Sequence, residues 1–273
     1  MRHAMAEALM LSKLRTTAVG KQLSGQRSLS LLYVISVIAG LLVWQLIASR
    51  YSTFVLATPP EVAKWFVSAS ASGDLPAALG GAFKHMLLGF FIALVIAVPI
   101  GFLTGRVRFI HELLDPVLNL AYAVPAIAWA PLIMIWFGLF FEARVALVVV
   151  MCVFDMIIVI DAGARNVDMR QINVGRSFGA SRWQIIRLVL LPASAPYLFA
   201  ALRIGVVRAV NAMITAELFL AAVNLGQMMK QAAVHFDSAG VLGVLFVISF
   251  LGLIFQELLL LLEKRVCNWL PRV

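Results

Sequence analysis

Long uninterrupted apolar segments, separated by shorter polar ones, dominate the chain. Six of these segments approach or exceed the roughly 20 residues that a helix needs to cross a bilayer. They cover residues 29–49, 85–105, 116–141, 145–160, 196–223 and 239–262. The strands of a membrane barrel would instead give alternating segments of about ten residues. The pattern therefore predicts an all-α, polytopic membrane protein with about six transmembrane helices.

Lysine and arginine are distributed unevenly between the connecting segments. Fifteen of them lie in the segments 1–28, 106–115, 164–195 and 263–273. Five, namely Arg50, Lys64, Lys84, Arg144 and Lys230, lie in the alternate segments. Because basic segments stay in the cytoplasm, both termini are predicted to be cytoplasmic. The expected organisation is a cytoplasmic N-terminal segment (1–28), a transmembrane domain (29–262) and a cytoplasmic tail (263–273).

The composition indicates that the protein is surrounded by lipid, and it argues against several classes of function. The chain is 63% hydrophobic and 13% charged, with a mean hydropathy of +0.99, so membrane lipid is its expected surrounding. The net charge of +9 follows from topology, because the basic residues lie between apolar segments. A nucleic-acid partner is therefore not expected. Two dispersed cysteines, Cys152 and Cys267, and four scattered histidines give neither a disulfide framework nor a metal site.

The segment 164–195, between the fourth and fifth spans, is too long for a simple helix connection. Asp168 and Ser181 are each followed by glutamine three residues later, a spacing typical of capped helix starts. Gly179 lies between them. We predict two short helices, joined by a glycine turn, that project a basic platform into the cytoplasm. A similar pattern at Thr58 predicts another short helix at the outer surface.

Several residues inside the predicted spans are unsuited to lipid contact. Prolines in the third span predict a kinked helix. In the fifth span Arg208, Asn211 and Thr215 form a polar stripe at helical spacing, and Asp155 in the fourth is the predicted partner of Arg208. That pair is either a structural ion pair or part of a pathway, and Glu217 is either a pathway residue or a cap. The candidate pathway residues are Pro125, Trp129, Pro131, Asp155, Arg208, Asn211, Thr215 and Glu217.

The sequence contains neither an ATP-binding motif nor a recognisable set of catalytic residues. It has no G-x-x-x-x-G-K-[ST] phosphate loop, and the acidic residues of its spans form no catalytic constellation, so no catalytic residue is assigned. Ionisable residues within the spans are also typical of an ion-coupled secondary transporter, which is one alternative function for the chain. That alternative predicts an inverted repeat with acidic ion sites, and no convincing repeat is present.

The segment that begins at Asn173 resembles the EAA motif, a cytoplasmic loop of ABC-importer permeases in which Glu-Ala-Ala precedes Gly, Ile and Leu-Pro at fixed spacing. Here Asn173, Val174 and Gly175 stand in place of Glu-Ala-Ala, and Gly179, Val189, Leu191 and Pro192 fall on the later positions. The resemblance implies contact with an ATPase through Asn173, Val174, Gly175, Gly179, Ala180, Ser181, Arg182, Leu191 and Pro192.

Further fragments narrow the resemblance to permeases of nitrate, sulfonate and taurine importers. These fragments are residues 56–62, 124–132 and 136–139. The resemblance implies a multi-pass protein of the bacterial inner membrane that moves a small organic or inorganic anion, with pyrimidine-like or aromatic compounds as alternatives. It also implies three partners: an ABC subunit that binds ATP and magnesium, a second copy of this chain, and an extracytoplasmic substrate-binding protein. No cofactor is expected in this chain.

Overall fold

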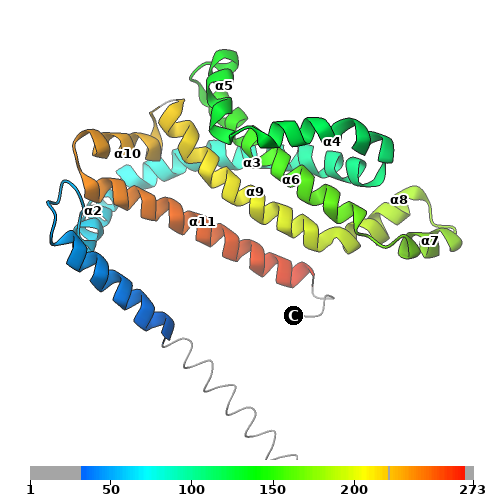
Figure 1. The fold of residues 1–273 in the computed structure, drawn as a ribbon, viewed down its shortest axis with the longest axis horizontal. Helices are drawn as coiled ribbons and strands as arrows, with labels where there is room; N and C mark the ends of the chain where they lie inside the picture. Colours follow the sequence, from blue (N-terminus) through cyan, green and yellow to red (C-terminus); the bar gives the residue numbers. More distant parts are fainter. Residues whose placement is uncertain (1–31, 221, 268–273) are drawn as a thin grey trace, which may run out of the picture.

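Every regular element in the computed structural model, which describes residues 32–220 and 222–267, is helical. The predicted all-α class is therefore confirmed for this part of the chain (Figure 1). Predictions that concern residues 1–31 and 268–273 lie outside the described residues. The elements are a helix at Leu32–Ala48, α2 (Pro59–Ala71), α3 (Asp74–Arg106), α4 (Arg108–Ala123), η1 (Ala126–Ala128), α5 (Trp129–Phe137), α6 (Phe141–Arg165), α7 (Met169–Ser177), α8 (Arg182–Ile185), η2 (Ile186–Leu190), α9 (Leu191–Phe219), α10 (Asn224–Val234) and α11 (Ser238–Val266).

Four of these helical segments are long and apolar enough to cross a membrane: Asp74–Arg106, Phe141–Arg165, Arg182–Phe219 and Ser238–Val266. They correspond to the second, fourth, fifth and sixth predicted spans. Three of them extend beyond both predicted bounds, whereas the fifth begins earlier than predicted, at Arg182, and ends earlier, at Phe219. The described part of the first predicted span forms the shorter apolar helix Leu32–Ala48. The apolar pattern thus located these helices but did not give their exact ends.

The third predicted span is not one kinked helix, and that prediction is wrong. The chain instead forms α4, then η1, then α5. Val124 has extended backbone angles (φ −72°, ψ 125°), because a residue before proline is pushed out of the helical region. Pro125 therefore separates two helices, whereas Pro116 lies inside α4 without ending it.

The N-terminal ends of both platform helices were predicted correctly. The second helix was predicted to be short and separate, and that part of the prediction is wrong. Asp168 accepts a hydrogen bond from the Arg170 backbone N–H (2.8 Å) and caps α7, and Ser181 forms a capping box with Gln184. Gly179 turns the chain with φ +76°. However, α8 continues through the π-helical turn η2 into α9, so one helical segment runs from Arg182 to Phe219.

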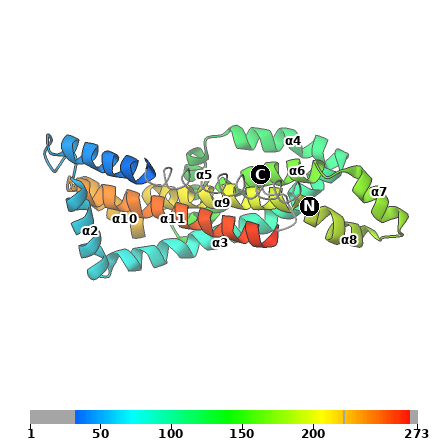
Figure 2. The ribbon, with the colours of Figure 1, turned by 90° about the horizontal axis from the view of Figure 1, so that it is seen from below.

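Close packing of α3, α6 and α9 forms the centre of the bundle (Figures 1 and 2). Glycines permit the approach of α3 to α6: a Cβ added at Gly89 would lie 2.6 Å from Val148 Cβ, and one at Gly101 2.7 Å from Ile160 Cβ. Small residues at helix interfaces let backbones approach in membranes. By contrast, α4 lies at the edge of the bundle and contains no buried residue.

Candidate functional site

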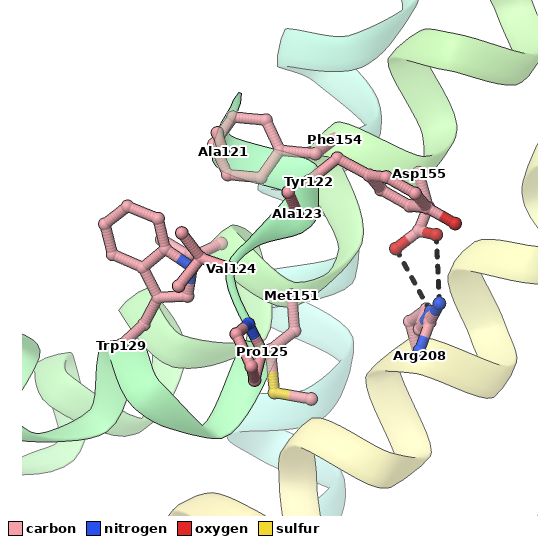
Figure 3. Close-up of a pocket in the computed structure, with 11 residues that line it drawn as sticks. Ala121, Tyr122, Ala123, Val124, Pro125, Trp129, Met151, Phe154, Asp155 and Arg208 are labelled. Carbon is pink, nitrogen blue, oxygen red and sulfur yellow. Dashed lines mark hydrogen bonds and ion pairs between the residues drawn. The ribbon is translucent and has the colours of Figure 1, made fainter. Parts of the chain in front are cut away.

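A cavity of about 390 Å³ opens where the break between α4 and α5 faces α6 and α9 (Figure 3). Charged side chains from α6 and α9 line it together with apolar residues, three of which are aromatic. The principal lining residues are Tyr122, Pro125, Trp129, Phe154, Asp155 and Arg208. Because Pro125 interrupts the helix, α4, α5 and the two residues Val124 and Pro125 between the helices all contribute to one side of the cavity. The cavity is thus a consequence of the break that the sequence did not predict.

Asp155 and Arg208 form the ion pair that the sequence predicted. Arg208 Nε lies 3.1 Å from Asp155 Oδ2, and Arg208 Nη2 donates to Asp155 Oδ1 at 3.1 Å. This two-point geometry is the one in which arginine pairs most strongly with a carboxylate. The side chain of Arg208 is 40% exposed and that of Asp155 is 13% exposed. The guanidinium therefore remains accessible from the cavity while its partner is mostly covered.

Two of the aromatic side chains that line the cavity stack on each other. Trp129 of α5 stacks on Phe154 of α6, with ring centroids 6.4 Å apart and an interplanar angle of 27°. Pro125 and Trp129 were predicted as pathway residues and both line the cavity. Tyr122 and Phe154 were missed by sequence reasoning. Their only signal is position, since one precedes the proline break and the other precedes Asp155.

The other predicted pathway residues do not line this cavity. Pro131 lies two residues after Trp129 in α5. Thr215 donates its hydroxyl to the backbone oxygen of Asn211 (2.7 Å), so part of the predicted polar stripe is satisfied within α9. The structure thus brings together Pro125, Trp129, Asp155 and Arg208, whereas the other four predicted residues (Pro131, Asn211, Thr215 and Glu217) lie outside the cavity lining.

Glu217 has the contacts of a cap, which is one of the two roles that the sequence left open. Its side chain is fully buried. It accepts hydrogen bonds from the Gly226 backbone N–H (2.9 Å) and the Asn224 side-chain amide (2.8 Å). Both donors belong to the first turn of α10, a helix that the sequence analysis missed. His85, also fully buried, lies with Nε2 3.8 Å from the Glu217 carboxylate.

The platform of α7 and α8 projects beyond the ends of α3 and α6 (Figures 1 and 2). Its exposed surface includes large apolar side chains: Val174 is 56%, Phe178 86% and Trp183 69% exposed. Gly175 instead faces inward, where an added Cβ would lie 3.7 Å from Ile185. Among the predicted coupling residues, Asn173, Val174, Gly179, Ser181 and Arg182 are exposed, whereas Gly175, Ala180, Leu191 and Pro192 are partly covered.

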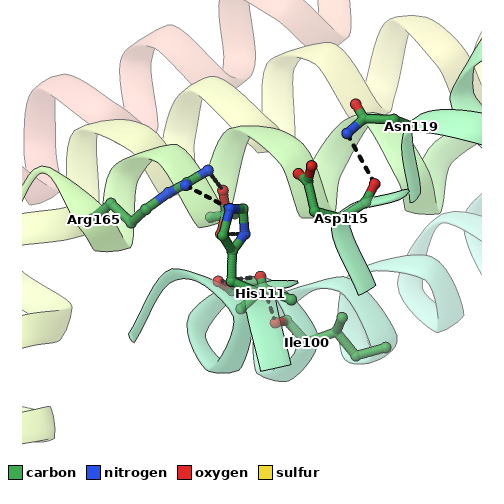
Figure 4. A network of polar contacts seen from close by, with 8 residues as sticks. Ile100, His111, Asp115, Asn119 and Arg165 are labelled. Atoms are coloured by element: carbon green, nitrogen blue, oxygen red, sulfur yellow. Dashed lines mark hydrogen bonds and ion pairs between the residues drawn. The ribbon is translucent and has the colours of Figure 1, made fainter. Parts of the chain in front are cut away.

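A polar cluster joins α4 to the end of α6 just before the platform (Figure 4). Arg165 Nη1 lies 3.0 Å from His111 Nε2 and also pairs with Asp161. His111 Nδ1 lies 3.8 Å from Asp161 Oδ1. The i, i+4 spacing of Asp161 and Arg165 gave a signal for that pair. The participation of His111 depends on the fold of α4 and had no such signal.

A bundle of long apolar helices, with an ion pair at an internal cavity and an exposed helical platform at one end, defines an integral membrane transport component. The chain belongs to the family of binding-protein-dependent transport system inner membrane components, whose family profile matches residues 97–267. It is thus the permease subunit of a binding-protein-dependent ABC importer, an inner-membrane and non-catalytic subunit. An ATPase subunit, which binds ATP, and a substrate-binding protein are its partners.

Individual proteins of this family agree with the assignment. The taurine transport system permease protein TauC of Escherichia coli is 29% identical over 84% of this chain and 86% of its own length. The riboflavin transport system permease protein RibX of Chloroflexus aurantiacus is 30% identical over 84% of this chain and 86% of its own. A solved chain of the MetNI methionine ABC transporter, in an inward-facing conformation, has a TM-score of 0.58 at 19% identity. The structural match covers 74% of this chain and 99% of the MetNI chain, which shows that the two have a common fold.

Proposed function

We propose that this permease crosses the membrane six times, with both termini and the platform in the cytoplasm. In this arrangement α4 and α5 together make the third crossing. The uneven distribution of basic residues supports the orientation, because segments 106–115 and 164–195 then lie on the same side as the N-terminal segment. The transmembrane domain is residues 29–262, flanked by cytoplasmic segments 1–28 and 263–273.

The platform is the contact for the ATPase subunit in this proposal. Exposed apolar side chains beside arginines suit a surface that docks in a groove of another protein. The contact residues are Asn173, Val174, Gly175, Gly179, Ala180, Ser181, Arg182, Leu191 and Pro192. A single observation carries the proposal: the helical segment Arg182–Phe219 begins in the platform and contains Arg208 at the cavity. A tilt of this segment, driven by nucleotide hydrolysis, would move Arg208 relative to Asp155.

The cavity beside Asp155 and Arg208 is part of the translocation pathway, and two copies of the chain complete that pathway. Its lining gives the proposed substrate class. An accessible guanidinium binds sulfonate, carboxylate or nitrate groups through charge-assisted hydrogen bonds. The taurine permease relative supports a small anionic solute. The riboflavin permease relative, together with Tyr122, Trp129 and Phe154 in the lining, supports an aromatic solute as the second candidate.

Uptake into proteoliposomes that contain the permease, its ATPase subunit and its substrate-binding protein tests the proposal. Labelled taurine, nitrate and riboflavin are the probes. We expect ATP-dependent uptake of a small anion, and a loss of at least tenfold, or about 1.4 kcal/mol in the transport barrier, for Arg208→Gln. Arg203→Gln is the matched control, because Arg203 lies on the same helix but pairs with Glu263 (3.5 Å) outside the cavity. Full uptake by Arg208→Gln would contradict the pathway assignment, and uptake of riboflavin alone would favour the second candidate.

A further inference from the structure

A second and larger cavity lies between the platform and the C-terminal part of α3. It has a volume of about 1100 Å³ and is bounded by the C-terminal part of α3, by α7 and α8, and by η2. Most of its wall is apolar. Representative wall residues are Val98, Phe102, Leu103, Ile172, Ile186 and Leu190. Leu103 is 49% exposed and Ile186 38% exposed, so the cavity is an open groove and not a sealed void.

Three arginines from three elements line the same groove: Arg106 of α3, Arg176 of α7 and Arg182 of α8. The lining contains no Asp or Glu. Among residues 32–220 and 222–267, none of the three has a carboxylate within 4.0 Å. The Nε atom of Arg106 is buried and has no hydrogen-bond partner within the described chain. The groove therefore holds three positive charges whose balancing anion comes from elsewhere.

The arginines lie at one end of the groove and the apolar wall runs away from them into the bundle. From Val98 to Arg106 the groove follows α3 for eight residues, about 12 Å at ~1.5 Å per residue. Trp183, 69% exposed and next to Arg182 in the chain, also lines the groove. An elongated apolar groove that ends in a cluster of arginines is complementary to a molecule with an anionic head and a hydrocarbon tail.

We infer that this groove binds one anionic phospholipid, with its phosphate among Arg106, Arg176 and Arg182 and an acyl chain along the wall of α3. Guanidinium groups pair with phosphate through two parallel hydrogen bonds, and basic pockets between helices on the cytoplasmic side hold anionic headgroups. A soluble anion would leave the apolar wall uncovered. The inference goes beyond the proposed function, because it concerns a resident lipid and holds for any transported solute.

The lipid would also connect two parts of the permease. Direct contacts from Arg106 to the platform are weak: its Nη2 lies 3.4 Å from the Val167 backbone oxygen and its Nη1 lies 3.8 Å from Met169 Sδ. A phosphate shared by Arg106 and Arg176 adds a link between α3 and α7. The phospholipid thereby positions the platform against the membrane domain.

Native mass spectrometry of the full-length permease tests the inference. The protein is taken from nanodiscs of equal parts phosphatidylglycerol and phosphatidylcholine, and retained lipid is counted per chain. We expect one retained phosphatidylglycerol, and a loss of at least tenfold in the triple variant Arg106→Gln, Arg176→Gln, Arg182→Gln. The control triple variant is Arg187→Gln, Lys264→Gln, Arg265→Gln, which removes the same charge from exposed positions outside the groove. Equal retention by both triple variants would overturn the inference.

Two further experiments distinguish a phospholipid from other possible occupants of the groove. Leu103→Trp fills the apolar wall but keeps the arginines, and it is expected to lower phosphatidylglycerol retention, whereas 10 mM glycerol phosphate is expected not to displace the lipid. Unchanged retention in Leu103→Trp, or displacement by glycerol phosphate, would indicate a simple anion site and overturn the inference. A photo-crosslinking residue at position 103 then identifies the neighbour in the complex with the ATPase. A phospholipid adduct supports the inference, and an adduct to residues 1–31 or to the ATPase subunit overturns it.

Discussion

Asp155 and Glu217 are both acidic residues within long apolar helices, but their surroundings differ in almost every respect. Asp155 pairs with a single arginine, and that arginine opens onto a cavity. Glu217 is fully buried and accepts hydrogen bonds from a backbone N–H and a side-chain amide of the next helix. The first arrangement leaves a charged group able to exchange partners. The second fixes the turn between α9 and α10, so acidic side chains within the apolar helices serve two purposes.

The comparison first predicts that Glu217 contributes more to stability than the ion pair at the cavity does. Glu217→Leu preserves volume but leaves the Gly226 N–H and the Asn224 amide without an acceptor. Each unpaired buried donor costs roughly 1–3 kcal/mol. Thermal unfolding of the purified protein in detergent should show a clear fall in the midpoint. Glu217→Gln, which keeps one acceptor oxygen, should lose less, and equal midpoints for wild type and Glu217→Leu would show that the cap is unimportant.

Next in size is the effect of Gly179, which lies in the turn just before the helical segment Arg182–Phe219. That segment contains both Arg208 and Glu217. Its φ of +76° costs a β-branched residue about 1–2 kcal/mol, and an added Cβ would meet nothing within 4 Å. Gly179→Val should therefore fold and insert, but should lose at least tenfold in uptake per ATP hydrolysed in proteoliposomes.

Gly179→Asn provides the matched control for that variant, because asparagine tolerates the left-handed conformation. It should retain most of the coupled uptake. Full uptake by Gly179→Val would exclude the turn as a coupling element, and loss of its insertion would mean that the turn supports the fold itself.

Much of this fold could be predicted from the sequence because lipid imposes a simple rule. Each spanning helix must satisfy its own backbone and present apolar side chains, so long apolar segments located α3, α6, α9 and α11. Capping chemistry is also local, and it placed the starts of α7 and α8. These signals need no knowledge of tertiary contacts.

Other features depend on contacts that the sequence does not reveal. Pro125 separates two helices while Pro116 and Pro196 lie inside helices, and the difference lies in what surrounds each one. Likewise, Asp155 could be paired with Arg208 because both are deep in the spans and opposite in charge. Glu217 finds its partners only after the chain reverses into α10, so its role as a cap could be named as an option but not chosen.

The smallest expected effect concerns the pair at the cavity. Asp155→Asn leaves Arg208 with a side chain that is 40% exposed and can reach water, so the loss in free energy of unfolding should be only about 0.5–1 kcal/mol. A double-mutant cycle with Asp155→Arg and Arg208→Asp measures the pairing term directly. Each single reversal places two like charges together, and the double reversal should recover most of the stability because the pair is restored with opposite orientation. A coupling energy of zero would mean that the two residues act independently. A recovered midpoint without recovered uptake would mean that the cavity needs its cation on α9, which is the arrangement expected if Arg208 contacts the solute.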